Sequence, residues 1–261
     1  MTTLNNADWI VPDWPAPPWV GSLSTTRRGG VSGGANGVFA SLNLGDHVGD
    51  DPASVAANRE IVCRRMNARP VWLKQVHGTQ VIDAAVCDAS GGQFPPEGDA
   101  AFARSPGLAC VVMTADCLPV LLCDTQGRVV AAAHAGWRGL LAGVLEATIA
   151  AMEVPGQELM AWLGPAIGPK AFEVGDEVRA AFVSVDPDAA AAFQPVSGGK
   201  WLADIYLLAR QRLMKRGVER VFGGNFCAVN EKVNGNERFF SYRRDGQTGR
   251  MASLIWISED K

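Results

Sequence analysis

Three short apolar segments follow one another in the middle of the chain, and they constrain the fold more than any other feature. They are LACVVMTADC (108–117), LPVLLCD (118–124) and RVVAAAHAGW (128–137), separated by polar or glycine-containing turns. Apolar runs of this length, bounded by turn residues, are typical of strands buried on both faces. The segment that follows them, residues 138–152, places its large apolar residues at helical spacing.

The same mixture continues on both sides of this central part. An Asp-Asp-Pro start predicts a capped helix over 50–66, and apolar spacing predicts helices within 171–185 and 203–218. Strands are predicted at 71–84, in 160–169 and 218–227, and as a pair around a glycine turn in 239–257. Because helices and strands interleave throughout, we predict an α/β fold, with α+β as the alternative. No linker or repeat interrupts the pattern, so we predict one catalytic domain over residues 1–261.

Charge and hydropathy exclude several classes of partner. The formal net charge is −3, whereas nucleic-acid-binding proteins are typically basic, so no nucleic-acid partner is expected. No apolar run reaches the roughly 18 residues of a membrane span, and residues 1–15 do not resemble a signal peptide. We therefore expect a cytoplasmic protein that is a monomer or a small homo-oligomer. Its six cysteines include no CxxC pair, which argues against a disulfide framework or a zinc ribbon.

Histidine is informative because the chain has only three. His77 follows WLKQV and His134 follows VVAAA, so each is predicted to close a strand, as is Cys117 at the end of CVVMTAD. Strand ends are where α/β proteins place ligands and catalytic groups. We therefore predict His77, Cys117 and His134 as the catalytic set. The third histidine, His47, lies in an acidic loop and is interpreted as a surface residue or as one behind the site.

Cysteine with two histidines is compatible with several chemistries, and the sequence leaves them open. It is a ligand set for catalytic zinc, with a fourth position for water or substrate. It also suits a cysteine nucleophile with a histidine base and no metal. With Met113 nearby in sequence it resembles a blue-copper set. Zinc, or else copper, is the predicted cofactor. Asp116, beside the thiol, is predicted to be catalytic, either as a general acid or base or by orienting a ligating histidine.

Each of these residues also has a purely structural interpretation. Buried cysteines are common and inert, so Cys117 alone would be a core residue in most proteins. The carboxylate of Asp116 next to the thiol is not needed for core packing, and this favours a functional role. His134 could be a hydrogen-bonded core residue, but the small residues around it indicate that another group approaches closely.

Several arginines are candidates for binding phosphate or substrate. Arg138 follows the HAGW turn at a predicted helix start, where backbone amides and the helix dipole attract anions. Arg243 and Arg244 lie with Arg250 around one turn, although a solvated hairpin tip is the more frequent case for such a run. Arg59 and Asn43 complete the predicted substrate- and phosphate-binding set.

Long motifs in the sequence carry a family resemblance. The chain from about residue 20 to its end resembles the YfiH family, also called the laccase-domain, polyphenol oxidase or peptidoglycan editing factor family. The motifs that carry this resemblance are LNLGDHVGDD, WLKQVHG, GDA, VVMTADCLPVLL, AAAHAGWRGLLAGVLEATI, WLGPAIGPKAFEVGDEV, ADIYLLARQRL and FFSYRRDGQTGRMASLIWI.

The resemblance implies an α/β/β/α sandwich similar to the catalytic domain of the cytotoxic necrotizing factor. It implies metal binding by the histidine of QVHG, the cysteine of TADC and the histidine of HAGW, which are His77, Cys117 and His134 here. It further implies phosphorolysis of adenosine, inosine, guanosine and methylthioadenosine, deamination of adenosine, and a link to peptidoglycan editing. The implied partners are thus a purine nucleoside and phosphate.

The number of histidines argues against a multicopper oxidase, because a multicopper centre needs far more imidazoles than the three in this chain. Any laccase-like activity would be weak and due to copper at a single site. Zinc-assisted attack on a purine and phosphate binding by arginines fit the residues better. Two alternatives remain: a metal-free amidase acting on cell-wall precursors with Cys117 as nucleophile, and a binding protein without turnover.

Overall fold

The computed structural model describes residues 9–34, 37–89 and 95–259, and its core is two β-sheets packed face to face. The four-stranded sheet has the order β1 (Val20–Ser24), β15 (Met251–Ile257), β5 (Leu108–Thr114), β2 (Arg69–Val71). The six-stranded sheet has the order β12 (Arg220–Gly223), β8 (Leu159–Leu163), β6 (Leu118–Asp124), β7 (Val130–Ala135), β4 (Ala100–Ala103), β3 (Val81–Asp83). Strands β2 and β3 are parallel to their neighbours β5 and β4, as is β12 to β8, and the other pairs in these sheets are antiparallel.

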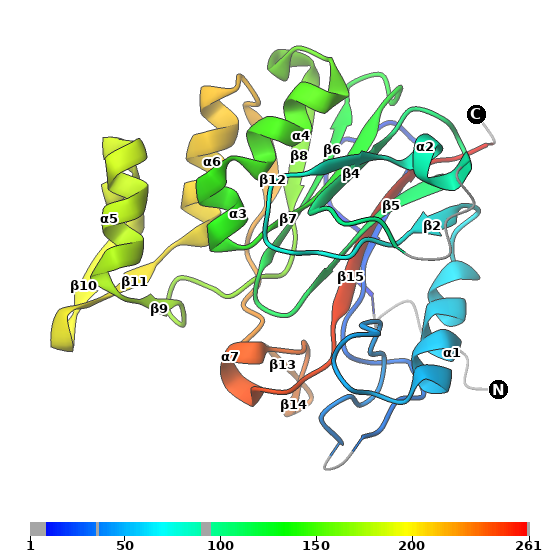
Figure 1. Ribbon diagram of the computed structural model, residues 1–261, viewed down its shortest axis with the longest axis horizontal. Helices are drawn as coiled ribbons and strands as arrows, with labels where there is room; N and C mark the ends of the chain where they lie inside the picture. The colour runs from blue at the N-terminus through cyan, green and yellow to red at the C-terminus, as the bar shows by residue number, and fades with distance from the viewer. Residues whose placement is uncertain (1–8, 35–36, 90–94, 260–261) are drawn as a thin grey trace.

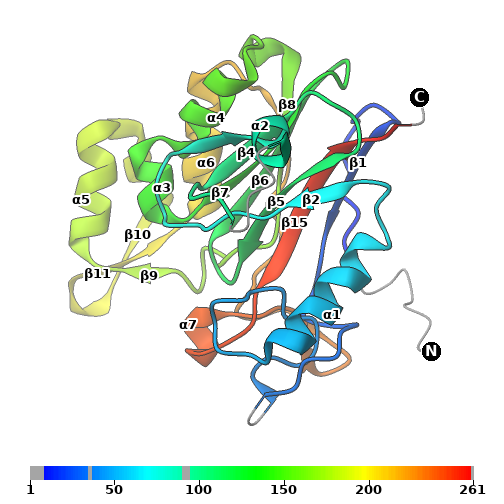
Figure 2. The same cartoon turned by 45° about the vertical axis from the view of Figure 1, so that its right-hand side comes forward.

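The helices lie around the two sheets, and some of them cover the outer faces. They are α1 (Pro52–Cys63), α2 (Ala84–Ala89), α3 (Trp137–Ala142), α4 (Val144–Met152), α5 (Asp176–Val185), α6 (Ile205–Lys215) and α7 (Tyr242–Asp245). Figure 1 shows α3, α4 and α6 beside the six-stranded sheet, and Figure 2 shows α1 on the opposite side of the molecule, against the four-stranded sheet. The predicted α/β class is confirmed by this mixed architecture.

Alternation of side chains along the strands explains the layering. On β6, Leu118, Val120 and Leu122 face the core shared with α4 and α6, whereas Leu121 and Cys123 face the other sheet. On β5, Cys110 and Val112 face the six-stranded sheet, whereas Ala109, Val111 and Met113 face α1. Because both faces are covered, these strands read as continuous apolar runs in the sequence.

Two smaller sheets lie outside this core. Strands β9 (Glu173–Val174), β11 (Lys200–Ala203) and β10 (Phe193–Val196) form one, and β13 (Lys232–Val233) pairs with β14 (Asn236–Glu237) in the other. Short 3-10 helices span Gly156–Glu158, Pro187–Ala192 and Ser197–Gly199. Figure 1 shows β9–β11 and α5 extending from the side of the body next to α6.

Several sequence predictions need correction. The single helix predicted over 138–152 is two helices, because Gly143 adopts φ 101°, a left-handed conformation that ends α3 and that glycine accepts without strain. The first of the two strands predicted in 239–257 is wrong, because Ser241 caps the short helix α7 by accepting a hydrogen bond from the Arg244 amide. His77 and Cys117 do not close strands: His77 lies in the loop 72–80, which replaces most of the strand predicted at 71–84, and Cys117 lies three residues after β5, directly before β6.

Candidate metal centre and cavity

The structure brings His77, Cys117 and His134 together. One ligand atom from each lies within 4.8 Å of the other two. The Sγ atom of Cys117 is 3.7 Å from Nε2 of His77, and the two imidazole rings meet edge to face with their centroids 4.8 Å apart. Among the described residues this is the one cluster of three or more histidine, cysteine or carboxylate side chains with metal-ligand spacing.

Each of the three residues comes from a different connection or strand. Cys117 lies in the short link between β5 of one sheet and β6 of the other, and His77 lies in the loop that crosses from β2 to β3. His134 is the penultimate residue of β7 and is buried. The site therefore forms where the chain passes between the two sheets.

A carboxylate that the sequence analysis did not single out holds two of these residues. Asp99 Oδ1 accepts hydrogen bonds from Nδ1 of His134 at 2.8 Å and from the His77 amide at 2.9 Å. Its Oδ2 accepts from the amides of Val76 at 3.1 Å and Gly78 at 2.7 Å. Asp99, rather than Asp116, is thus the carboxylate that orients the ring of His134. With Nδ1 donating to Asp99, Nε2 of His134 is left to bind a metal.

The electrostatics favour a charged cysteine. Burial raises the pKa of the Cys117 thiol, but the imidazoles of His134 and His77 outweigh it and bring that pKa below its usual range. Burial in turn lowers the pKa of His134, but Cys117 and Asp99 together raise it above its usual range. A thiolate is the form that binds zinc or copper and the form that acts as a nucleophile.

The donor set fits a single metal ion, and one of its ligand-atom pairs has the spacing of a tetrahedral site. A tetrahedral zinc ion with ordinary Zn–N and Zn–S bonds places its ligand atoms roughly 3.3–3.8 Å apart, and the 3.7 Å between Cys117 and His77 falls in this range. Gly136 leaves the necessary room, because a Cβ there would lie 2.9 Å from Sγ of Cys117 and 3.0 Å from Cδ2 of His77. The same donors also suit copper.

The cluster forms part of the wall of a cavity of about 370 Å³. Its apolar and aromatic lining comes from Met113, Ala115, Trp137, Ile167, Phe172, Ile205 and Tyr242. Its polar lining, besides the three cluster residues, comes from His47, Gln75, Thr114, Asp116, Arg138, Arg243 and Arg250. A concave site of this size, mostly apolar with a few converging polar groups, is typical of small-molecule binding.

Asp116 lines this cavity with a largely buried carboxylate. Its Oδ2 accepts a hydrogen bond of 2.6 Å from the Arg243 amide, whereas its buried Oδ1 has no hydrogen-bond partner among the described residues. Burial raises the pKa of Asp116, although the Arg243 amide and Ser241 work against this. The backbone at Asp116 has φ 90°, an uncommon conformation for a residue other than glycine. Asp116 is therefore a cavity-lining residue with one buried oxygen that has no hydrogen-bond partner in the described structure.

The predicted arginines divide into two groups. Arg138 and Arg243 line the cavity; the guanidinium of Arg138 lies 4.4 Å from the ring centroid of Trp137, and that of Arg243 lies 5.8 Å from the centroid of Phe172. Arg243 also donates to the carbonyls of Ala171 and Glu173. Neither forms an ion pair with a carboxylate in the described part of the chain.

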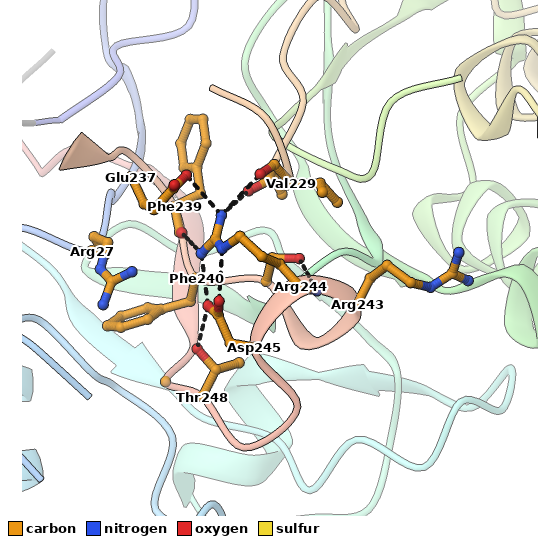
Figure 3. A network of polar contacts seen from close by, with 12 residues as sticks. Arg27, Val229, Glu237, Phe239, Phe240, Arg243, Arg244, Asp245 and Thr248 are labelled. Carbon is orange, nitrogen blue, oxygen red and sulfur yellow. Dashed lines mark hydrogen bonds and ion pairs between the residues drawn. The ribbon is translucent and has the colours of Figure 1, made fainter. Parts of the chain in front are cut away.

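The other predicted binding residues are engaged by the protein itself. Figure 3 shows Arg244 donating to the carboxylates of Asp245 and Glu237 and to backbone carbonyls that include Phe239. Arg59 donates to the carbonyl of Leu44, pairs with Asp46 and stacks on Trp72. Asn43 is buried and bonds to Gly45, Asp50 and the Arg250 amide. None of these three side chains lines the cavity.

Arg250 faces the cavity, whereas its neighbour in the turn, Arg244, does not. Its half-buried side chain lines the cavity and donates to the carbonyls of Thr248 and Gly249 through Nη1. Burial lowers the pKa of Arg250, and the nearby Cys117 and Asp116 raise it, so these groups share one electrostatic environment. The signal in the sequence was the run of three arginines around one turn, which does not reveal which of them faces inward.

Comparison with known proteins identifies the family. A sequence model of the family described as multi-copper polyphenol oxidoreductase laccase matches residues 21–258. A Pseudomonas aeruginosa protein named purine nucleoside phosphorylase is 54% identical over 96% of this chain and 99% of its own. The purine nucleoside phosphorylase YfiH of Escherichia coli is 53% identical over 95% of this chain and 98% of its own.

Solved structures agree with this assignment. The crystal structure of Neisseria meningitidis NMB0706, a DUF152 protein, superposes with a TM-score of 0.90 at 54% identity, covering 96% of this chain and 99% of that one. YlmD of Geobacillus stearothermophilus superposes with a TM-score of 0.85 at 28% identity, covering 98% of each chain. The chain belongs to the YfiH family of laccase-like proteins.

No helix in the described ranges has the length and apolar character needed to cross a membrane.

Proposed function

We propose that the chain is a zinc-dependent purine nucleoside phosphorylase that acts on adenosine, inosine, guanosine and methylthioadenosine and also deaminates adenosine. The observation that carries this proposal is the union, in one cavity, of the His77–Cys117–His134 cluster with arginines that lack carboxylate partners. The names of the relatives, which match this chain over nearly their whole length, support the same activity.

In this proposal the aromatic and the cationic groups of the cavity bind the two substrates. Trp137, Phe172 and Ile167 provide the flat apolar contacts that a purine base needs. Arg138, Arg243 and Arg250 can bind phosphate, because guanidinium groups match its oxygens and theirs are not neutralised by an ion pair in the described structure. Asn43, Arg59 and Arg244 are left out of the proposed phosphate site, since protein groups already occupy their donors.

The chain's own residues supply most of the chemistry in this proposal. His77, Cys117 and His134 would hold the zinc ion, which as a Lewis acid would polarise a bound oxygen and favour its deprotonation near neutral pH. The carboxylate of Asp116, which has one oxygen without a hydrogen-bond partner in the described structure, would hydrogen bond with the substrate or hold a proton. Asp99 keeps Nε2 of His134 free by accepting from Nδ1.

The family description mentions multi-copper oxidation, but the residues of this chain do not support a multicopper centre. The chain has three histidines, too few for a trinuclear copper cluster together with a blue-copper centre. Weak copper-dependent oxidation of phenols at the single site is the alternative that this donor set permits.

A second candidate function rests on the cysteine. Sγ of Cys117 lies 3.7 Å from Nε2 of His77, and the neighbouring imidazoles lower the pKa of the thiol after opposing the effect of burial. This pair would suit a metal-free hydrolase or amidase acting on peptidoglycan precursors.

Measuring metal content together with turnover tests the proposal. The purified protein is expected to contain about one zinc per chain and to convert adenosine and phosphate to adenine and ribose 1-phosphate, with inosine formed as well. Chelation should abolish both reactions and added zinc should restore them. His77→Ala should lose zinc and activity, and His47→Ala, which alters a cavity-lining histidine outside the cluster, should keep its zinc. Nucleoside turnover that survives complete removal of metal would contradict the zinc role, and no nucleoside turnover at all would favour the amidase.

Several wider expectations accompany this function. The partners would be a purine nucleoside and phosphate, with neither nucleic acid nor a membrane, and the protein would work in the cytoplasm as a monomer or small homo-oligomer. Similarity to the catalytic domain of the cytotoxic necrotizing factor likewise stays a prediction.

A further inference from the structure

We propose that Asp99 is a positioning residue that assembles two of the three metal ligands as one unit, fixing the ring of His134 and the backbone of His77 through a single carboxylate. The inference rests on the metal-binding part of the proposed function. It assigns the role to a residue that contacts neither the metal position nor the cavity.

The loop that carries His77 is wrapped around this carboxylate. The consecutive amides of Val76, His77 and Gly78 all donate to Asp99. His77 has φ 62°, in the left-handed region that is uncommon for residues other than glycine, although histidine enters it more often than most. Successive amides in such a conformation form a concave anion site, often called a nest. Here the anion is a side chain of the protein, and it compensates the unusual backbone at His77.

The other half of the arrangement is a carboxylate–histidine pair. Asp99 Oδ1 accepts from Nδ1 of His134 at 2.8 Å, and both side chains are buried. Its backbone is tied to the same strand, because the carbonyl of Asp99 accepts from the His134 amide at 2.7 Å. The carboxylate therefore accepts from the ring of His134 and from the main chain of His77. Displacing either histidine would change how the carboxylate accepts from the other.

The division of the hydrogen bonds between the two oxygens makes the proposal testable by one substitution. Oδ1 accepts from the His134 ring and the His77 amide, and Oδ2 accepts from Val76 and Gly78. An asparagine has one oxygen and one NH₂ group, which is a donor only. Whichever way the amide is turned, two donors of the protein would then face two donors of the asparagine. If Asp99 served only to orient His134, asparagine would be an adequate replacement, because its oxygen could accept from Nδ1.

We expect Asp99→Asn to lower zinc affinity by about 100-fold or more, at or beyond the upper end for residues that support a ligand. The measurement is competition with a chromophoric chelator. The cobalt(II)-substituted variant should also show weaker ligand-field absorption, because His77 or His134 leaves the coordination sphere. Asp124→Asn is the matched control: Asp124 is likewise a buried carboxylate that accepts from two backbone amides, but it lies at the opposite end of β6 from Cys117. Zinc affinity and the cobalt spectrum should be unchanged in this control.

Each outcome decides a separate question. Zinc binding by the wild type with equal binding by Asp99→Asn overturns the role of Asp99 and leaves the proposed enzyme intact. A wild type that binds no zinc overturns the metal site itself. Should Asp99→Asn fail to fold, hydrogen exchange of the metal-free wild type decides. Slow exchange of the amides of residues 76–78, which lie outside any strand, supports the nest, and rapid exchange at all three refutes it.

Discussion

The side-chain amide of Gln75 pairs with the backbone of Met113 as a neighbouring strand would. Nε2 of Gln75 donates to the Met113 carbonyl at 2.8 Å, and Oε1 accepts from the Met113 amide at 2.7 Å. Strand β2 pairs with β5 only as far as Cys110, so beyond that point Gln75 satisfies the open edge of β5. The pairing fixes the start of the loop that leads to His77.

Replacing Gln75 with alanine should therefore affect both stability and the metal site. Two backbone groups of Met113 lose their partners, which we expect to lower the free energy of unfolding by about 1–2 kcal/mol. The loop loses its attachment to β5, so zinc affinity should fall as well. Denaturant unfolding and chelator competition measure the two effects. Gln194→Ala, at an exposed position on β10, should change neither, and an unaltered zinc affinity in Gln75→Ala would show that Asp99 alone holds the loop.

Gly136→Ala should disrupt the metal cluster with little effect elsewhere. The added Cβ would lie 2.9 Å from Sγ of Cys117 and 3.0 Å from Cδ2 of His77, closer than such atoms normally approach. We expect a protein that folds but binds less than one zinc per chain and loses most of its turnover. Elemental analysis and circular dichroism check this. Gly33→Ala, where nothing lies within 4 Å of the new atom, should retain full metal content, and so should Gly136→Ala if the cluster is not built as described.

Arg250→Met should weaken phosphate binding selectively. The guanidinium lines the cavity without a carboxylate partner in the described structure, and losing a charge-assisted contact of this kind typically costs about 1.5–3 kcal/mol. The KM for phosphate should then rise roughly 10–100-fold, with the KM for the nucleoside nearly unchanged. Arg250→Lys should recover part of the loss, and Arg220→Met, on the edge strand β12, should have no effect. Equal changes in both KM values would instead indicate a general distortion of the cavity.

Asp124 should make the fold sensitive to acid. This buried carboxylate accepts from the amides of Arg128 and Val129 and from Nε of Arg128. Burial alone would raise the pKa of Asp124, but the Arg128 side chain and these amides outweigh it, so the pKa is lower in the folded protein. Its contribution to stability is thus complete above the unfolded pKa of about 3.9 and is lost as pH falls through the lower folded value.

The comparison with Asp124→Asn tests that sign. At pH 7 the variant should be less stable by about 1–3 kcal/mol, and the gap to the wild type should close as the pH is taken below about 4. Urea unfolding at a series of pH values gives both numbers. Asp13→Asn, at an exposed carboxylate, should leave the pH profile unchanged, whereas a gap that stays constant into acid would remove Asp124 as the cause.

The central strands were predictable because their residues are buried on both sides. Apolar runs at 108–117, 118–124 and 128–137 became β5, β6 and β7 with only their ends shortened. An apolar run does not indicate which sheet its strand joins. The change of sheet between β5 and β6, which takes three residues, was therefore not predictable. Local signals of another kind were missed: the left-handed Gly143 that divides one apolar helix, and the Ser241 cap that replaces a strand with α7.

The three cluster residues were predictable from their unusual flanks, whereas their support was not. Asp99 follows a proline- and glycine-rich stretch and resembles any loop carboxylate. Its amide partners lie 21–23 residues earlier in the chain, and His134 lies 35 residues later. Likewise, nothing local distinguishes Arg244, whose donors are all used within the protein, from Arg250, which faces the cavity. Such distinctions depend on contacts between distant segments.

The link between β5 and β6 has a consequence for the order of events in the life of the protein. Cys117 and His77 lie on two of the connections that pass between the sheets, and His134 lies on one of the sheets themselves. The three residues come together only when these segments are in place, so we expect a metal ion to bind late, to a chain whose sheets have already docked. A bound ion would then cross-link the segments between the two sheets, and separating the sheets would require its release.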